Sequence, residues 1–145
     1  MVVACLQLSA DVPEREFMPQ PTITNRASGE ATIGERLSVT GASFTVQEWR
    51  GSGPATLHVH HSDDEAWHVL EGTLRFRFAD RIVEVPAGET VFVPAGVAHT
   101  YEAIAARYLV VLTPRLAALI QELQDTADRS RHPAIYRAHD SQLLE

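Results

Sequence analysis

The stretch from His58 to Gly72 reads HVHHSDDEAWHVLEG and contains four of the chain's seven histidines. His58 and His60 are two residues apart on a predicted strand, so their side chains leave the same face of that strand. The polar run 62–64 predicts a short turn, which brings the carboxylate of Glu65 back beside the two imidazoles. The spacing therefore predicts three side chains that converge on one metal ion.

A second stretch, from Gly88 to His99, reads GETVFVPAGVAH. Its Pro and Gly residues predict turns at 86–88 and 94–96, with a strand at 89–93 between them. His99 follows the second turn, and an antiparallel barrel would bring it alongside the first stretch. Three neutral imidazoles and one carboxylate suit Fe(II), Mn(II), Co(II), Ni(II), Cu(II) or Zn(II) rather than Ca²⁺ or Mg²⁺.

Around these stretches, residues 32–113 form short β-rich runs separated by Gly, Pro and Asp, as in an antiparallel sandwich or barrel. In the run 74–78 the apolar residues alternate with Arg75 and Arg77, so the apolar side chains should face the core and the arginines the outside. We also expect hairpin turns at 40–41 and 79–80, and a strand over 66–70 that ends at Gly72.

Helical periodicity begins only after Thr113, which with Pro114 suits the cap and first turn of a helix. We place this helix at 114–124, because its apolar residues follow the spacing of one helix face: Leu116, Leu119, Ile120 and Leu123. A polar linker at 125–133 should follow. Residues 134–145 then form either a last short helix or an extended segment.

The composition excludes several classes of protein. A chain of 145 residues is close to one average domain. Twelve arginines, no lysine and a net charge of −7 leave no basic run for a nucleic acid. The lone Cys5 cannot form an intrachain disulfide, and no apolar run is long enough to span a membrane. We expect a soluble, cytoplasmic protein that does not bind nucleic acid or membranes.

The two stretches resemble the two motifs of the cupin superfamily. His58-x-His60, four residues, Glu65, six residues and Gly72 match the first motif. Gly88, five residues, Pro94-x-Gly96, two residues and His99 match the second. The resemblance covers residues 41–113, and the helix after it is similar to that of small quercetinase-like cupins. The chain departs from the motifs at Gly53, one residue closer to His58 than usual, and at Ala103, where Asn is usual.

The resemblance implies an all-β double-stranded β-helix, or jelly roll, with a C-terminal amphipathic helix. We divide the chain into an N-terminal arm at 1–30, the barrel at 31–113, and the helix and tail at 114–145, within one domain overall. The resemblance also implies a dioxygenase that acts on a small enolic or aromatic substrate. Two alternatives are a metal-dependent isomerase and a non-catalytic domain that binds a small ligand.

In this interpretation each chain holds one divalent transition metal ion through four ligands: His58, His60, Glu65 and His99. Glu65 is both a ligand and the general base. Trp67 shares strand parity with Glu65, and Tyr101 shares it with His99, so each either lines the substrate pocket or packs in the core. His61 and His68 have the opposite parity and should lie outside the pocket, while His132 and His139 should be solvated.

The N-terminal segment from Val2 to Leu8 alternates between apolar and other residues as a strand does. An open sandwich leaves unpaired backbone groups at its edge, and these attract another strand. We therefore expect a homodimer in which this segment adds to the barrel of a neighbouring chain. The alternative is pairing of the same segment within its own chain.

Overall fold

The computed structural model describes residues 38–51 and 56–145, all within one compact unit that runs from Ala31 to Glu145. The expected arm, the segment from Val2 to Leu8 and Gly53 lie outside the described residues. The elements, in chain order, are β1 (Ser38–Thr40), β2 (Thr45–Arg50), β3 (His58–His60), β4 (Glu65–Phe78), β5 (Ile82–Pro86), β6 (Thr90–Val93), β7 (His99–Leu112), α1 (Pro114–Asp125), the 3-10 helix η2 (Arg129–Arg131), α2 (His132–Ala138) and β8 (Ser141–Leu143).

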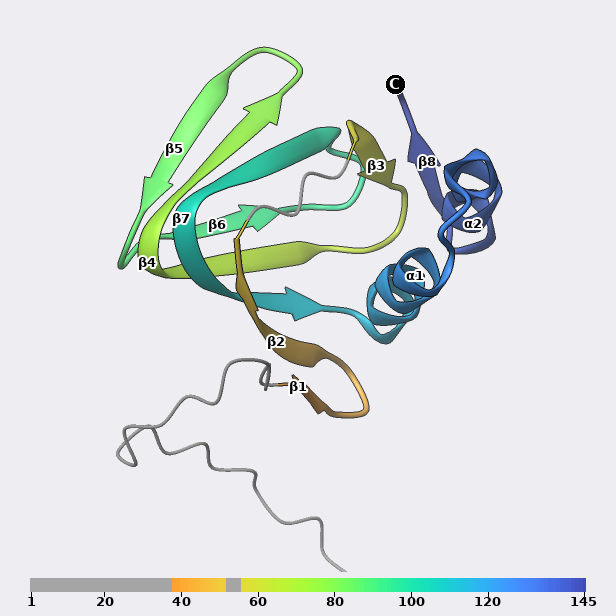
Figure 1. Ribbon diagram of the computed structural model, residues 1–145, viewed down its shortest axis with the longest axis horizontal. Coiled ribbons are helices and arrows are strands. Elements are labelled where there is room, and N and C mark those ends of the chain that lie inside the picture. The colour runs from red at the N-terminus through yellow and green to blue at the C-terminus, as the bar shows by residue number, and fades with distance from the viewer. Residues whose placement is uncertain (1–37, 52–55) are drawn as a thin grey trace, which may run out of the picture. The chain divides into compact units, whose positions relative to one another are not determined.

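The predicted antiparallel jelly roll is confirmed (Figure 1). Two strands of 14 residues each, β4 and β7, form its centre and pair with each other. In addition, β7 pairs with β2 and β3, and β4 pairs with β5 and β6. The short strand β8, near the C-terminus of the chain, pairs with β3 and so adds one more strand to the sheet. None of the helices in the described part of the chain is long and apolar enough to cross a membrane.

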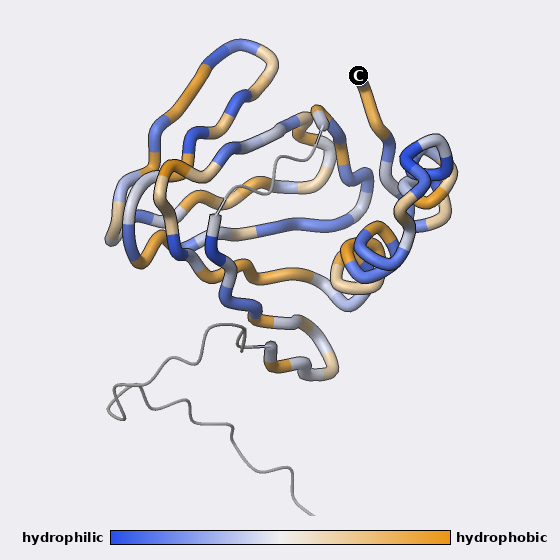
Figure 2. The backbone as a smooth tube through the Cα atoms, viewed as in Figure 1, coloured by the Kyte–Doolittle hydropathy of each residue, from blue (hydrophilic) through white to orange (hydrophobic). Residues whose placement is uncertain are grey.

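The alternation along β4 places the core as expected, and Figure 2 shows hydrophobic and hydrophilic residues alternating along the strands. Leu74 and Phe76 have no exposed surface. Arg75 points outward and binds Glu84 and Glu102 through its guanidinium. The expected turns at 40–41 and 79–80 are also present, because each lies between the paired strands of a hairpin.

The expectation that a strand ends at Gly72 is wrong, because β4 continues through this residue to Phe78. The pairing of β4 with β7 shifts register on both sides of Glu71, so the strand bends there instead of ending. Gly72 has a φ of +70°, and a Cβ atom at this position would lie 2.3 Å from the carbonyl oxygen of Ala105. A glycine is therefore required by the bend and by the close approach of two backbones.

The C-terminal helix begins where the sequence predicts and ends one residue later, at Asp125. The Thr113 side chain caps it by accepting a hydrogen bond from the backbone N–H of Leu116. Leu116 and Leu119 are buried on its inner face. The expected linker at 125–133 is only partly correct, because η2 and the start of α2 fall inside it. For residues 134–145 the sequence predicts either a short helix or an extended segment, and both are present. Most of α2 lies in this range, and the extended strand β8 follows it.

Candidate metal centre

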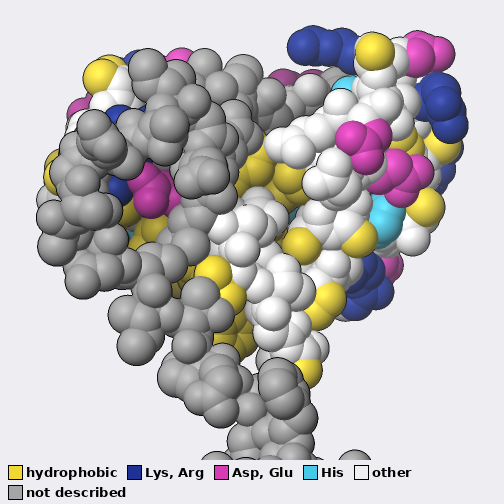
Figure 3. Space-filling view, turned by 60° about the horizontal axis from the view of Figure 1, so that its bottom comes forward, with side chains coloured by type: hydrophobic (Ala, Val, Ile, Leu, Met, Phe, Trp, Pro, Cys, Tyr) yellow, Lys and Arg dark blue, Asp and Glu magenta, His cyan; other side chains and the backbone are white. Residues whose placement is uncertain are grey.

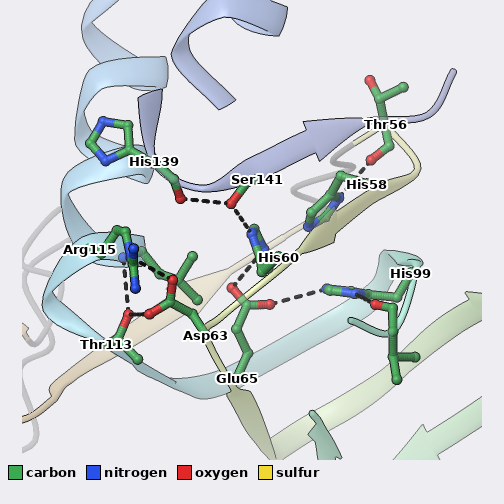
Figure 4. Close-up of polar contacts among 12 residues, drawn as sticks. Thr56, His58, His60, Asp63, Glu65, His99, Thr113, Arg115, His139 and Ser141 are labelled. Atoms are coloured by element: carbon green, nitrogen blue, oxygen red, sulfur yellow. Dashed lines mark hydrogen bonds and ion pairs between the residues drawn. The ribbon is translucent and has the colours of Figure 1, made fainter. Parts of the chain in front are cut away.

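Four buried side chains meet at the end of the barrel where β3, β4 and β7 come together (Figure 4). His58 and His60 are on β3, Glu65 is the first residue of β4, and His99 is the first residue of β7. His58 and His99 are direct partners across the two strands. One ligand atom from each of the four side chains lies within 4.8 Å of all the others. The structure thus brings together the four residues that the sequence predicts as ligands.

The carboxylate of Glu65 lies between two of the imidazoles. Its Oε1 atom is 3.4 Å from Nε2 of His60, and its Oε2 atom is 3.1 Å from Nε2 of His99. The ring of His58 lies next to both other rings, with centroid distances of 4.7 Å to His60 and 4.4 Å to His99. Donor atoms gathered this closely from three elements could hold a single ion.

The outer nitrogens of two rings show which nitrogen is free for a metal. Nδ1 of His58 is 2.8 Å from the carbonyl oxygen of Thr56, and Nδ1 of His99 is 3.0 Å from that of Val97. A carbonyl oxygen only accepts, so Nδ1 donates in both pairs and Nε2 of the neutral ring carries a lone pair. The short contact between His99 and Glu65 then needs either a second proton on the ring or a cation between the two atoms. The residues present therefore fit a metal ion.

Burial and neighbouring groups set the charges of the cluster. Burial, and to a smaller extent the nearby His99 and His60, lower the pKa of His58 to about 4. Burial alone would raise the pKa of Glu65, but the contacts of its two oxygens with His60 and His99 outweigh this effect, and the pKa lies at about 2. At neutral pH the cluster thus holds a neutral His58 and a charged Glu65, which are the forms that bind metals.

A cavity of about 480 Å³ opens onto the cluster. Trp67 and Tyr101 both line it, which is one of the two positions predicted for them. Both also pack against core residues, Trp67 with its ring centroid 5.0 Å from that of Phe76. Burial and the neighbouring Tyr108 raise the pKa of Tyr101 well above its ordinary value, while an interaction with Trp67 acts in the opposite direction. The core and pocket alternatives are therefore both met.

Helix α1 supplies an apolar wall of the same cavity, and hydrophobic side chains gather in the middle of the face that Figure 3 shows. The helix residues on this wall are Leu116, Leu119, Ile120 and Leu123. The sequence pattern indicates that this apolar face of the helix is buried, but it does not indicate that the face borders the cavity. Tyr136 of α2 is a lining residue that sequence reasoning missed entirely. Its ring lies 5.5 Å from that of His58, and burial raises its pKa to about 12, so it carries its proton at neutral pH.

The remaining histidines follow the predictions in part. His61 is exposed, and His68 binds the Thr90 hydroxyl away from the cavity. The expectation that His132 and His139 are solvated holds only in part, because both are half-buried. His132 lines the cavity, and His139, whose side chain is 17% exposed, binds Glu122 of α1. Both are partly covered because α2 packs against α1, a contact between two helices that local patterns do not reveal.

The molecule is thus an antiparallel jelly roll with a buried cluster of three histidines and one glutamate that could hold one metal ion. A family model described as "Cupin domain" matches residues 44–113. The chain therefore contains a domain of the cupin superfamily, in agreement with the two motifs.

Solved structures and one curated protein show similarity to parts of the chain. The protein NMB1881 from Neisseria meningitidis has a TM-score of 0.50 at 18% identity, covering 64% of this chain and 99% of that one. A cupin-2 domain containing protein from Shewanella frigidimarina has a TM-score of 0.49 at 26% identity, covering 56% and 80%. Mannose-1-phosphate guanylyltransferase 2 of Escherichia coli O157:H7 is 36% identical over 47 residues, which are 32% of this chain and only 10% of that protein.

Proposed function

We propose that the chain is a metal-dependent dioxygenase for a small enolic or aromatic substrate. One divalent transition metal ion is held by His58, His60, Glu65 and His99. The observation that carries this proposal is the position of the buried donor cluster at the base of the cavity. Four protein ligands leave about two positions open on a six-coordinate ion, and open positions are typical of catalytic rather than structural sites.

The walls of the cavity favour an apolar substrate over a sugar. Most of its lining side chains are aliphatic or aromatic, and they come from both the barrel and the helices. A sugar's hydroxyl groups would have to pair with the less numerous polar residues of the lining, such as Gln124, Arg129 and Glu145, and each one left unpaired would be costly. A planar molecule with an apolar body and one oxygen-rich end satisfies both the walls and the base of the cavity.

The residues around the cluster have distinct roles in this proposal. A bound metal supplies Lewis-acid and redox chemistry at its open positions. Glu65 accepts the proton of the substrate's enolic hydroxyl, and Trp67 and Tyr101 flank the substrate. Nε1 of Trp67 is buried and interacts with the Tyr101 hydroxyl, which links the two side chains that flank the substrate.

Metal analysis combined with oxygen measurements tests the proposal. Wild-type protein should contain about one transition metal ion per chain and should consume O₂ with a flavonol or a diketone from a substrate panel. His60→Ala and His99→Ala should lose both properties. His61→Ala is the matched control, because His61 is adjacent in sequence but exposed outside the cluster. Full metal content in both ligand variants would contradict the assigned site.

The same experiment separates the alternatives by their products. A dioxygenase places both atoms of ¹⁸O-labelled O₂ in the product, whereas an isomerase converts its substrate without consuming oxygen. Turnover without oxygen would rule out the dioxygenase, and a product with the same mass as the substrate would assign the chain to the isomerases. Ligand binding without any turnover would assign it to the non-catalytic domains.

A further inference from the structure

The last strand of the chain lies directly beside the strand that carries two of the four ligands. In the pairing of β8 with β3, Ser141 is opposite His60 and Leu143 is opposite His58. The backbone N–H of Leu144 also donates to the carbonyl oxygen of Leu57, at 2.8 Å. The C-terminal segment is thus hydrogen-bonded to the ligand strand along its whole length.

The hydroxyl of Ser141 contacts the outer nitrogen of His60 (Figure 4). The two atoms are 2.7 Å apart, and both residues are buried. The same hydroxyl donates its proton to the carbonyl oxygen of His139, at 3.1 Å. A hydroxyl has only one proton to donate, so Ser141 Oγ accepts the hydrogen bond from Nδ1–H of His60. This leaves Nε2 of the neutral His60 ring unprotonated on the side of Glu65.

All three histidines of the cluster thus carry their proton on Nδ1, but the group that accepts this hydrogen bond differs. For His58 and His99 the acceptor is a backbone carbonyl two residues earlier in the chain. For His60 it is a side chain 81 positions away. We propose that Ser141 is a positioning residue that fixes His60 in its metal-binding tautomer and orientation, which makes β8 a part of the metal centre. This inference rests on the metal site of the proposed function.

A group of polar contacts holds Ser141 at the required place. The preceding residue, Asp140, turns the chain with a φ of +52°, and its carbonyl accepts from the backbone N–H of His61, at 3.0 Å. Its carboxylate accepts from the Ser62 hydroxyl and lies 3.8 Å from the guanidinium of Arg115. Arg115 also pairs with the buried Asp63, at 2.8 Å. The loop after β3, the start of α1 and the turn before β8 are therefore joined next to the metal centre.

Metal affinity measured on three variants tests the role of the hydroxyl. Loss of a group that orients a metal ligand typically weakens metal binding about 10–100-fold. Ser141→Ala should weaken Zn(II) binding by this factor in a competition assay with a chelator, and Ser141→Thr should recover most of the affinity. Ser130→Ala is the matched control, because it removes a hydroxyl that binds Asp128 and touches neither a ligand nor the contacts that hold Ser141. Equal affinity of the Ser141→Ala and Ser130→Ala variants would overturn the proposal.

Nitrogen NMR of the metal-free protein tests the tautomer directly and needs no bound metal. In wild type, long-range proton–nitrogen correlation spectra should show a proton on Nδ1 of His60, and Ser141→Ala should shift the population toward the Nε2–H form. An unprotonated Nδ1 in wild type, or an unchanged tautomer in the variant, would refute the role of Ser141. Absence of Zn(II) binding by wild type would instead refute the metal site itself, so the two failures are distinguishable.

Discussion

Glu65 differs from the other members of the buried cluster because it brings both a negative charge and a proton-accepting oxygen. Replacing it with Gln keeps the shape of the side chain but removes the charge and most of the basicity. Loss of a general base typically reduces turnover about 10²–10⁴-fold. We therefore expect Glu65→Gln to lower kcat by this factor while substrate Kd changes much less, as measured by steady-state kinetics and calorimetry.

The cavity offers a matched control for this substitution. Glu145 also lines the cavity, but its carboxylate is half exposed and pairs with Arg77. Glu145→Gln removes the same charge from the cavity without touching the donor cluster, so kcat should stay close to the wild-type value. If Glu65→Gln turned over at the wild-type rate, the assignment of Glu65 as the base would be wrong.

The stability of the metal-free protein should fall in acid, in two successive pH ranges. The pKa of His58 is about 4 in the fold against an ordinary 6.5, so as the pH drops from 6.5 toward 4 the unfolded chain gains a proton that the fold does not accept. The pKa of Glu65 is about 2 against an ordinary 4.5, so its stabilising effect is complete above pH 4.5 and is lost toward pH 2.

Urea unfolding between pH 7 and pH 4 measures the first range. His58→Ala should flatten the dependence of the unfolding free energy on pH in this range, while His61→Ala should leave it as in wild type, because His61 is exposed. The same slope in all three proteins would contradict the assigned effect of burial on His58.

The four cluster residues were predictable, three of them from strand parity and a short turn, and His99 from the expected antiparallel barrel. His58 and His60 need only the two-residue repeat of a strand, and Glu65 needs only the turn between two strands. Ser141 and Tyr136 were not predictable, since they reach the site only when the C-terminal segment packs onto the barrel. No local pattern in the sequence specifies that contact.

At the scale of elements, the bend in β4 depends on Gly72. Both Gly72 and Gly88 have a positive φ, but only at Gly72 would a Cβ atom meet another backbone. Gly88→Ala should cost about 1–2 kcal/mol of unfolding free energy from its left-handed conformation. Gly72→Ala should cost roughly 1–3 kcal/mol more, because the two backbones must move apart.

Chemical unfolding of the two variants measures this difference. Gly88→Ala controls for backbone strain, so a cost for Gly72→Ala that is no larger would mean that β4 and β7 separate without resistance. The sequence marks Gly72 as a special position, but a glycine that ends a strand and one that bends it look the same. Only the pairing of β4 with β7 distinguishes them.

At the scale of the whole molecule, we predict a homodimer that depends on the segment from Val2 to Leu8. The outer face of the sheet carries apolar side chains that are in register across three strands, with Ala66 between the exposed Phe92 and Val111. Such a row, together with an apolar segment, favours association between chains. Light scattering should give the mass of a dimer for the full chain and of a monomer for a chain that begins at Val12.

The outcome of this truncation is decisive for the segment. A truncated chain that remains fully dimeric would show that residues before Val12 are unnecessary for the assembly. A full chain that is already monomeric would favour the alternative, in which the same segment pairs within its own chain.

Helix α1 contributes a wall of the cavity but no member of the donor cluster. The donor cluster and this wall of the cavity are therefore encoded in separate stretches of the sequence, whereas Trp67 and Tyr101 each lie two residues after a donor. Mutations along the inner face of α1 would change the size and shape of the cavity while leaving the four donors in place. Such a division would allow one barrel to admit new ligands in small steps, with the donor cluster inherited unchanged.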